Sequence, residues 1–362
     1  MSAPSHMEEE KILLPGQSPQ GEYILAVLVK RTYAIGAAGL ERVEAKLVKG
    51  DKHYGDPRAT PVEFEADLVP FKLATDVVVN AKAYAPDGRP VREVRCGVRV
   101  GPVAKEVVAI GDRTAMYRAD AAPVFTEPAP FTEMPVTYDR AYGGVDIRSD
   151  PDMPYPYPRN PLGRGFAVKN TKAAVDGLTL PNIEDARVRL APEALALGDY
   201  AAWQKQPMPQ GIGWFPKVLY PRGPLAGILP ADRPIEEQMR RELAQAVPPD
   251  QRDAYLNSRL PDMDFRFFNG ASQGLVAPYL AGDEDVLTEG LVPEGRLAFK
   301  LPGERPKIAL DIGSGPSTLE VVLHTVMIRV EQRQVDLVWR GAMPYPGPDW
   351  LPQMKKLEID IR

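Results

Sequence analysis

The chain has 362 residues and a net charge of −5, with 44% hydrophobic and 26% charged residues. These values exclude a wholly disordered chain and allow one large or two moderate domains. Nucleic acid is not a predicted partner, because its phosphates require a clustered excess of Lys and Arg. The 39 prolines and 30 glycines are dispersed along the chain. Since proline removes a backbone donor and stops helices, strands and loops should dominate.

The N-terminus and the cysteine content indicate where the protein works. Residues 1–19 are expected to be flexible, and the His6-Met7 pair resembles a cloning junction. Neither a run of about 18 apolar residues nor a basic segment followed by an apolar one is present, so we predict no membrane insertion and no secretion signal. Cys96 is the single cysteine. This fits a reducing compartment, and we expect a cytoplasmic protein.

The first third of the domain, residues 20–120, has strand patterns. Residues 23–35 form an apolar run with both parities filled, typical of a buried strand. Residues 62–68 alternate and place Glu65 on the outer face. Strands at 76–84 and 91–100 are joined by a Pro-Asp-Gly turn, and a strand at 107–110 follows. We predict an antiparallel unit that forms a sandwich.

Aromatic residues crowd the next segment, up to residue 232, although its many prolines interrupt regular elements. So much aromatic area is not typical of a linker, and long ordered loops packed over the sheets are predicted. The candidate partner-binding surface there consists of Tyr142, Tyr155, Tyr157, Phe166, Trp203, Trp214 and Phe215. For any one of these residues, closing the core is an equally weighted alternative.

The remaining elements complete the predicted fold. A small helical insertion at 232–257 begins at the N-cap Asp232. Strands are expected at 297–301, 307–312, 318–330, 335–340 and 357–361. A change of apolar parity within the third of these predicts a β-bulge near Thr325. The predicted class is mainly β, an antiparallel sandwich-like fold with long ordered loops. It forms one domain over 20–362, divisible into 20–120 and 121–362.

Residues that support catalysis are scarce. The histidines, His6, His53 and His324, lack metal-ligand spacing, and no nucleotide-binding glycine pattern precedes a helix. The carboxylates Asp262, Asp264 and Glu184 leave a carbohydrate-active enzyme or a lectin-like binder as an alternative. Capping and salt bridges explain these acids better. We therefore predict no enzyme activity, no cofactor and no metal.

Charged residues set among apolar or glycine-bearing segments form a second pattern. Buried charges must be paired, so we predict interior ion pairs that pin the long loops. Direct contact with a partner is the alternative. The predicted set is Arg31, Asp67, Lys72, Asp76, Asp112, Arg113, Arg164, Glu184, Asp262, Asp264 and Arg340.

Short stretches in a fixed order between residues 20 and 345 carry a family resemblance. They are VKRTY at 29–33, DLVPFK at 67–72, TD at 75–76, GDR at 111–113, Tyr138 with AYGG at 141–144, NPLGRG at 160–165, LPNIE at 180–184, LPDMD at 260–264 with FFN at 267–269, and LVWRG at 337–341. The chain resembles the type VI secretion accessory proteins long catalogued as a domain of unknown function. These resemble effector adaptors distinct from the Eag and Tap types.

This resemblance implies a cytoplasmic adaptor-chaperone without catalytic residues. It would bind a toxic effector protein and help load it onto the secretion spike, which is made of VgrG and PAAR-type proteins. A structural component of the secretion apparatus is the alternative from another class of protein. Such a component should assemble with itself at high order, whereas an adaptor should form a small species with its partner.

Overall fold

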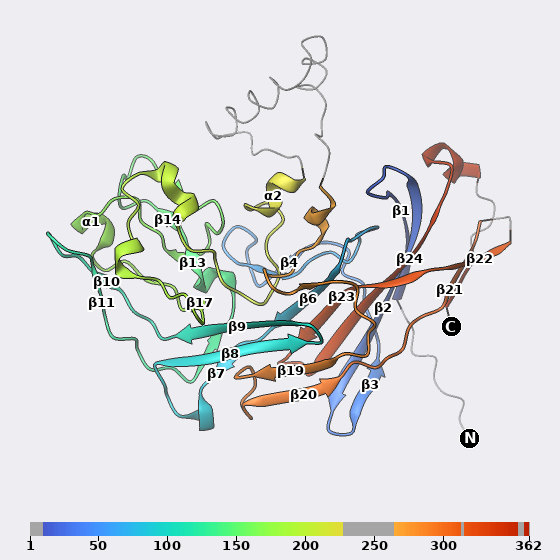
Figure 1. Cartoon of the computed structure of the whole chain (residues 1–362), viewed down its shortest axis with the longest axis horizontal. Coiled ribbons are helices and arrows are strands. Elements are labelled where there is room, and N and C mark those ends of the chain that lie inside the picture. Colours follow the sequence, from blue (N-terminus) through green and yellow to red (C-terminus); the bar gives the residue numbers. More distant parts are fainter. Residues whose placement is uncertain (1–9, 227–263, 313–314, 354–357, 362) are drawn as a thin grey trace, which may run out of the picture.

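Two β-sheets form the body of the protein (Figure 1). The structure is a computed structural model that describes residues 10–226, 264–312, 315–353 and 358–361. The predicted helical insertion at 232–257, the His6-Met7 pair and Asp262 lie outside the described residues.

The larger sheet has the strand order β1-β2-β24-β23-β6-β18, with β3 also paired to β2. Its strands are β1 (Glu10–Gln17), β2 (Tyr23–Gly36), β3 (Gly39–Val43), β6 (Thr75–Asn80), β18 (Val276–Ala277), β23 (Val321–Arg329) and β24 (Gln334–Pro344). The pairing of β23 with β6 is parallel and the others are antiparallel, so the sheet is mixed. Both faces of β2 are buried from Ile24 to Tyr33, as its apolar run predicts.

Two details of this sheet bear on the predictions. The register between β23 and β24 shifts between Leu323 and Thr325, which confirms the predicted bulge. Residues Glu10–Gln17, expected to be flexible, instead form β1 and pair along β2. Pro15 lies in β1, which is a terminal strand of the sheet, where a missing backbone donor is tolerated.

The second sheet has the strand order β17-β9-β8-β19-β20. Its strands are β8 (Glu93–Val100), β9 (Val103–Ile110), β17 (Ile183–Asp185), β19 (Asp285–Glu289) and β20 (Arg296–Lys300). Alternate residues of β8, including Val94, Cys96 and Val98, are buried in one core with residues of the larger sheet such as Leu25 and Val27. This packing confirms a mainly β, sandwich-like fold.

Short strands form three further small sheets. They are β4 (Lys52–His53) with β5 (Val62–Phe64), β7 (Lys82–Tyr84) with β12 (Glu133–Pro135), and β21 (Ile308–Asp311) with β22 (Pro316–Leu319) and β25 (Glu358–Ile361). The Pro-Asp-Gly sequence forms the turn η1 (Pro86–Gly88), where Gly88 has a φ of 63°. The strand predicted at 62–68 is shorter than expected, because β5 ends at Phe64.

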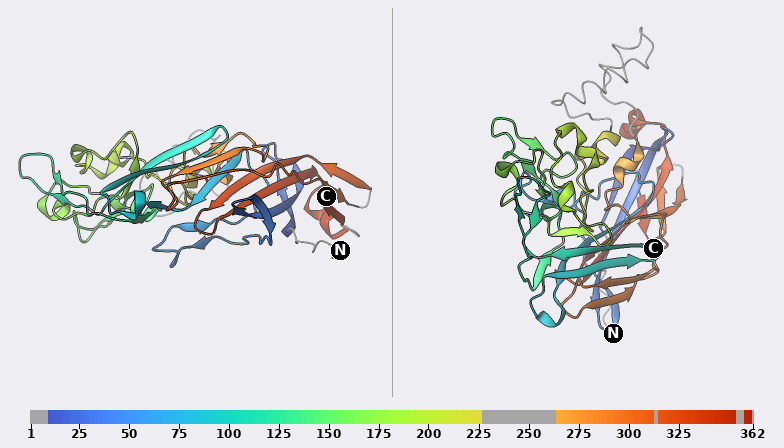
Figure 2. Two further views of the ribbon diagram at one scale, coloured as in Figure 1. Left: turned by 90° about the horizontal axis from the view of Figure 1, so that it is seen from below. Right: turned by 60° about the vertical axis from the view of Figure 1, so that its left-hand side comes forward.

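Most of residues 111–226 form a loop lobe (Figure 2). This lobe has its own apolar core. Its elements are β10 (Ala115–Met116), β11 (Val124–Phe125), η2 (Tyr138–Arg140), β13 (Tyr142–Gly143), β14 (Val145–Asp146), β15 (Tyr155–Pro156), β16 (Arg164–Gly165), α1 (Lys172–Val175), η3 (Pro192–Ala194), η4 (Tyr200–Lys205) and α2 (Arg222–Leu225). Beyond the lobe lie η5 (Phe265–Phe268) and η6 (Pro348–Gln353). The long ordered loops are confirmed.

All of these helices are short. Within the described ranges, none has the length and apolar character needed to span a membrane.

Candidate partner-binding site

The aromatic residues proposed as a binding surface are mostly interior. Six of the seven are buried and Tyr155 is partly buried, so the expected exposed aromatic surface is not formed. Tyr142, Tyr155, Tyr157, Phe166 and Trp203 belong to the core of the loop lobe, Trp214 to the core between the sheets, and Phe215 to a small cluster with Tyr138.

Tyr157 shows why these aromatic side chains are buried rather than exposed. Its ring centroid lies 5.3 Å from that of Tyr142 and 5.1 Å from that of Phe166. The lobe has only very short strands and helices, so these aromatic rings supply the apolar area that orders its loops.

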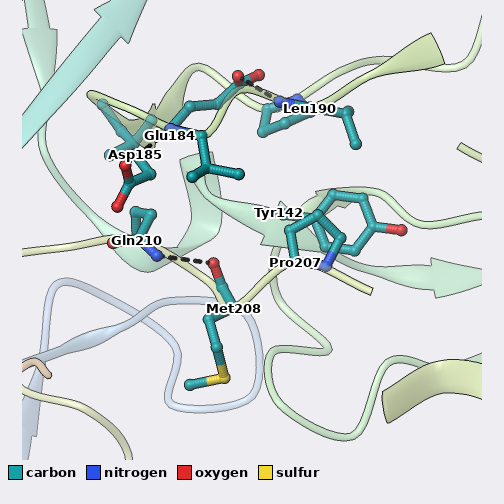
Figure 3. Close-up of a pocket in the computed structure, with 10 residues that line it drawn as sticks. Tyr142, Glu184, Asp185, Leu190, Pro207, Met208 and Gln210 are labelled. Carbon is teal, nitrogen blue, oxygen red and sulfur yellow. Dashed lines mark hydrogen bonds between the residues drawn. The ribbon is translucent and has the colours of Figure 1, made fainter. Parts of the chain in front are cut away.

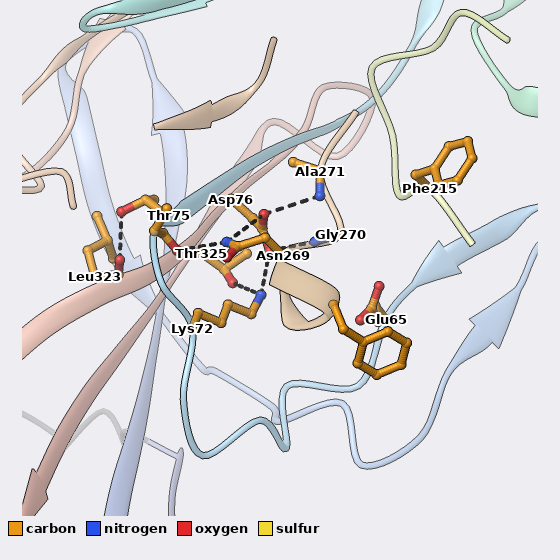
Figure 4. A network of polar contacts seen from close by, with 12 residues as sticks. Glu65, Lys72, Thr75, Asp76, Phe215, Asn269, Gly270, Ala271, Leu323 and Thr325 are labelled. Carbon is orange, nitrogen blue, oxygen red and sulfur yellow. Dashed lines mark hydrogen bonds and ion pairs between the residues drawn. The ribbon is translucent and has the colours of Figure 1, made fainter. Parts of the chain in front are cut away.

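A buried carboxylate, Asp76, organises the first ion-pair network (Figure 4). It lies 2.6 Å from Lys72 Nζ, and it accepts hydrogen bonds from the backbone of Gly270 and Ala271 and the amide of Asn269. The same Lys72 ammonium donates to Thr325 at the bulge, at 3.1 Å. The pair therefore joins β6, β23 and the 269–271 segment, as the structural interpretation predicts.

A second network holds the loop lobe to the five-stranded sheet. Arg113 donates to Glu184, and Asn182 donates to Asp112 at 3.0 Å. The carbonyl oxygen of the Asn182 amide accepts from Arg164, also at 3.0 Å. Burial raises the pKa of Glu184, and the Arg113 charge opposes that rise. These four predicted charged residues therefore all have hydrogen-bond or ion-pair partners within the protein.

The other predicted charges differ in their surroundings. Asp67 is paired with Lys30 at 2.9 Å, and Arg31 lies 3.7 Å from Glu304. Asp264 pairs with Arg266 on the surface, so its expected interior role is wrong.

Arg340 departs from the prediction in a different way. Its guanidinium lies over the ring of Phe71, 4.6 Å from the centroid. In the described ranges, no carboxylate lies at ion-pair distance from Arg340. A cation–π contact therefore replaces the predicted ion pair.

Sequence reasoning missed the most regular buried pair, Glu65 with Arg222. Their two nitrogen–oxygen contacts are both 2.6 Å, and the side chains are 3% and 5% exposed. Arg222 also donates to the backbone oxygens of Phe215 and Phe267 at 2.7 Å. Alternation placed Glu65 outward, but β5 ends at Phe64, so the alternation no longer applies there.

A pocket of about 120 Å³ lies beside β17, the terminal strand of the smaller sheet (Figure 3). Its walls come from the loop after β17 and from the 207–210 segment, and they include Tyr142, Ile183, Val188, Leu190, Pro207 and Met208. Val188 is 75% exposed. The pocket is therefore mainly apolar and is accessible at one side.

The polar groups of this pocket already have partners. Glu184 accepts from Arg113 through one oxygen and from the Leu190 backbone, at 2.9 Å, through the other. Gln210 donates to the Met208 carbonyl at 3.1 Å. A glycosidase needs two carboxylates that act on the substrate. Glu184 and Asp264 are both engaged by arginines instead, which counts against their use as such a pair.

Part of the outer side of β17 has no strand partner in the described part of the chain, although Glu184 there is buried and Asp185 is partly buried. All three of its residues pair with β9, and Ile183 also forms a bridge to Ala141 on the other side. Among the described residues, Glu184 and Asp185 have no strand partner on that outer side. An added extended segment would thus meet both a strand edge and an apolar pocket.

Comparison with known proteins identifies one family. No curated protein and no solved structure matches the chain. A family model described as an uncharacterized protein conserved in bacteria (DUF2169) matches residues 20–340. This match covers the loop lobe and most of both sheets, and so the chain belongs to this bacterial family.

Proposed function

We propose that this protein is a non-enzymatic adaptor that binds a partner protein at the unpaired edge of β17. The observation that carries the proposal is the apolar pocket beside that edge, in which Glu184 is already paired. We further propose that the partner is a type VI secretion effector, which the adaptor helps load onto a VgrG or PAAR-type spike protein. The short sequence stretches that occur in a fixed order between residues 20 and 345 support this part of the proposal.

The size of the pocket favours one inserted side chain. Sites for small ligands have volumes of roughly 300–1,000 Å³. A cavity of about 120 Å³ is smaller, and its apolar walls suit an aliphatic side chain. In strand addition, backbone hydrogen bonds provide affinity, and pockets for alternate side chains provide specificity. The proposed contact combines the two.

Two exposed valines provide a matched test. Val188 lines the pocket and is 75% exposed, whereas Val218 is 78% exposed and does not line it. The adaptor is co-expressed with the product of the neighbouring gene, which is the candidate toxin, and the complex is isolated and its mass measured. Val188→Asp should weaken binding at least about tenfold, because it places a charge where an apolar side chain inserts. Val218→Asp should leave binding unchanged.

Two further results are expected if the protein is an adaptor. Wild-type adaptor and toxin should elute as a small complex of fixed stoichiometry, and secretion of the toxin should require the adaptor. Equal solubility and secretion of the toxin without the adaptor would show the proposal to be wrong. High-order self-assembly of the isolated protein would instead support a structural component of the apparatus.

A further inference from the structure

A second, larger pocket lies apart from β17. Its volume is about 380 Å³, and it shares no lining residue with the pocket of Figure 3. Four separate parts of the chain form it: the β4–β5 hairpin, the β6–β7 junction, residues 135–140 and the turn between β23 and β24. The volume lies in the range of roughly 300–1,000 Å³ that is usual for ligand sites.

The charged groups that line this pocket differ in whether they have an ion-pair partner. Lys82 Nζ is 3.0 Å from Glu133 and 3.3 Å from Glu331, so its charge is neutralised within the protein. The Glu63 and Asp139 carboxylates form no ion pair within the described part of the chain. Both belong to half-buried residues, which limits the water available to them.

The remaining cations near the pocket do not form ion pairs with these carboxylates. Arg140, which also lines the pocket, directs Nη1 to the Met134 sulfur at 3.1 Å and to Asn182 at 3.2 Å. Lys52 and Arg329 act on Glu63 only through space. Burial outweighs their effect and raises the pKa of Glu63. The pocket therefore retains acceptors for a positively charged group.

One wall of the pocket is aromatic and apolar. Tyr54 lies at the rim with its side chain partly exposed, and Pro61, Ala81 and Pro135 complete the apolar lining. The carboxylates of Glu63, Glu331 and Asp139 line the same pocket as this phenol group.

We propose that this pocket binds a guanidinium group. A guanidinium offers five donors in a plane, which suits two carboxylates that approach from different segments. Its flat face can stack on the Tyr54 ring, and the methylenes that carry it can pack against the prolines. The group can come from an arginine side chain of a protein or from a free guanidine compound. The inference does not depend on the adaptor function.

Calorimetric titration of the full chain tests the proposal with three probes. These are the peptide acetyl-Gly-Gly-Arg-Gly-Gly-amide, the same peptide with citrulline in place of arginine, and agmatine. Citrulline keeps the shape of arginine but lacks its charge. The arginine peptide should bind at least about tenfold more tightly than the citrulline peptide, because only the former makes charge-assisted hydrogen bonds. Added salt should weaken its binding.

Variants locate the site. Glu63→Gln and Asp139→Asn should each weaken binding about tenfold or more, because each removes one charged acceptor. Glu106→Gln makes the same charge change at an exposed position on β9 and should have no effect. Thermal unfolding identifies any variant that fails to fold, and the other variant then decides.

Each outcome has a definite meaning. Binding of agmatine but not of the arginine peptide would support the guanidinium site and assign it to a free compound. Equal binding of the arginine and citrulline peptides would overturn the proposal, as would binding of neither agmatine nor the arginine peptide. Unchanged affinity in both folded variants would overturn it too.

Discussion

Removal of the Asp76 carboxylate should be one of the most damaging single changes in the molecule. Asp76 is fully buried, and it neutralises Lys72, whose side chain is 5% exposed. It also accepts hydrogen bonds from Asn269, Gly270 and Ala271. Asp76→Ala leaves a buried ammonium without a counter-charge, which costs about 3–5 kcal/mol. The three amide donors that would lose their acceptor contribute to that loss of stability. Urea unfolding followed by tryptophan fluorescence measures it.

The double variant separates charge from hydrogen bonding. Lys72→Met in the Asp76→Ala background removes the uncompensated charge, so the double variant should be more stable than Asp76→Ala alone. For comparison, Arg95 and Glu106 are 66% and 53% exposed. Removal of either should cost no more than about 1 kcal/mol. If Asp76→Ala costs no more than these surface changes, the pinning role assigned to the network is wrong.

Three further predictions concern Gly111, Cys96 and Lys105. Gly111→Ala should cost at least about 1–3 kcal/mol in urea unfolding, because its Cβ would lie 1.7 Å from the Ala129 carbonyl oxygen. In the control Gly50→Ala, the added Cβ would have no atom within 4 Å, so the free energy of unfolding should be nearly unchanged. Burial raises the pKa of Cys96 to about 12, so a thiol reagent at pH 8 should label it only after unfolding. Burial lowers the pKa of Lys105 to about 8. The folded state thus loses this proton before the unfolded state does, and stability should rise between about pH 8 and pH 10.4 relative to Lys105→Met. An equal pH dependence in Lys105→Met would contradict the last of these.

The elements that could be predicted have strong local patterns. The buried run of β2 fills both parities, and β8 alternates between core and solvent. The bulge near Thr325 could be found because an extra residue changes the parity of the apolar positions in β23. In each case, a few neighbouring residues contain the whole signal.

The interactions that could not be predicted join distant parts of the chain. Arg222 and Glu65 are separated by 157 positions, and nothing local in the sequence indicates that they pair. The contact of Arg340 with Phe71 likewise depends on tertiary packing. Strand β1 was missed because its apolar residues do not alternate strictly, so its pairing with β2 decides its structure.

The candidate sites also depend on residues that are distant in the sequence. The pocket beside β17 requires Tyr142, the loop after β17 and the 207–210 segment to meet, and only the folded chain brings them together. The sequence did indicate residue types suited to binding, but it assigned the exposed role to aromatic residues that the fold places in its cores. The domain division at residue 120, the secretion role and the cytoplasmic location stay predictions.

The loop lobe suits the proposed binding function because its loops are fixed by buried polar side chains. Asn160 donates to the carbonyl oxygens of Tyr138 and Tyr142 at 2.7 and 3.1 Å. Asp146 accepts from the backbone of Arg148 and Val168 at 2.9 and 2.7 Å. Loops held in this way are ordered before a partner arrives, so binding costs little additional conformational entropy. A pocket large enough for a single side chain can then contribute usefully to affinity. In a flexible loop, the ordering cost would offset much of what so small an apolar contact provides.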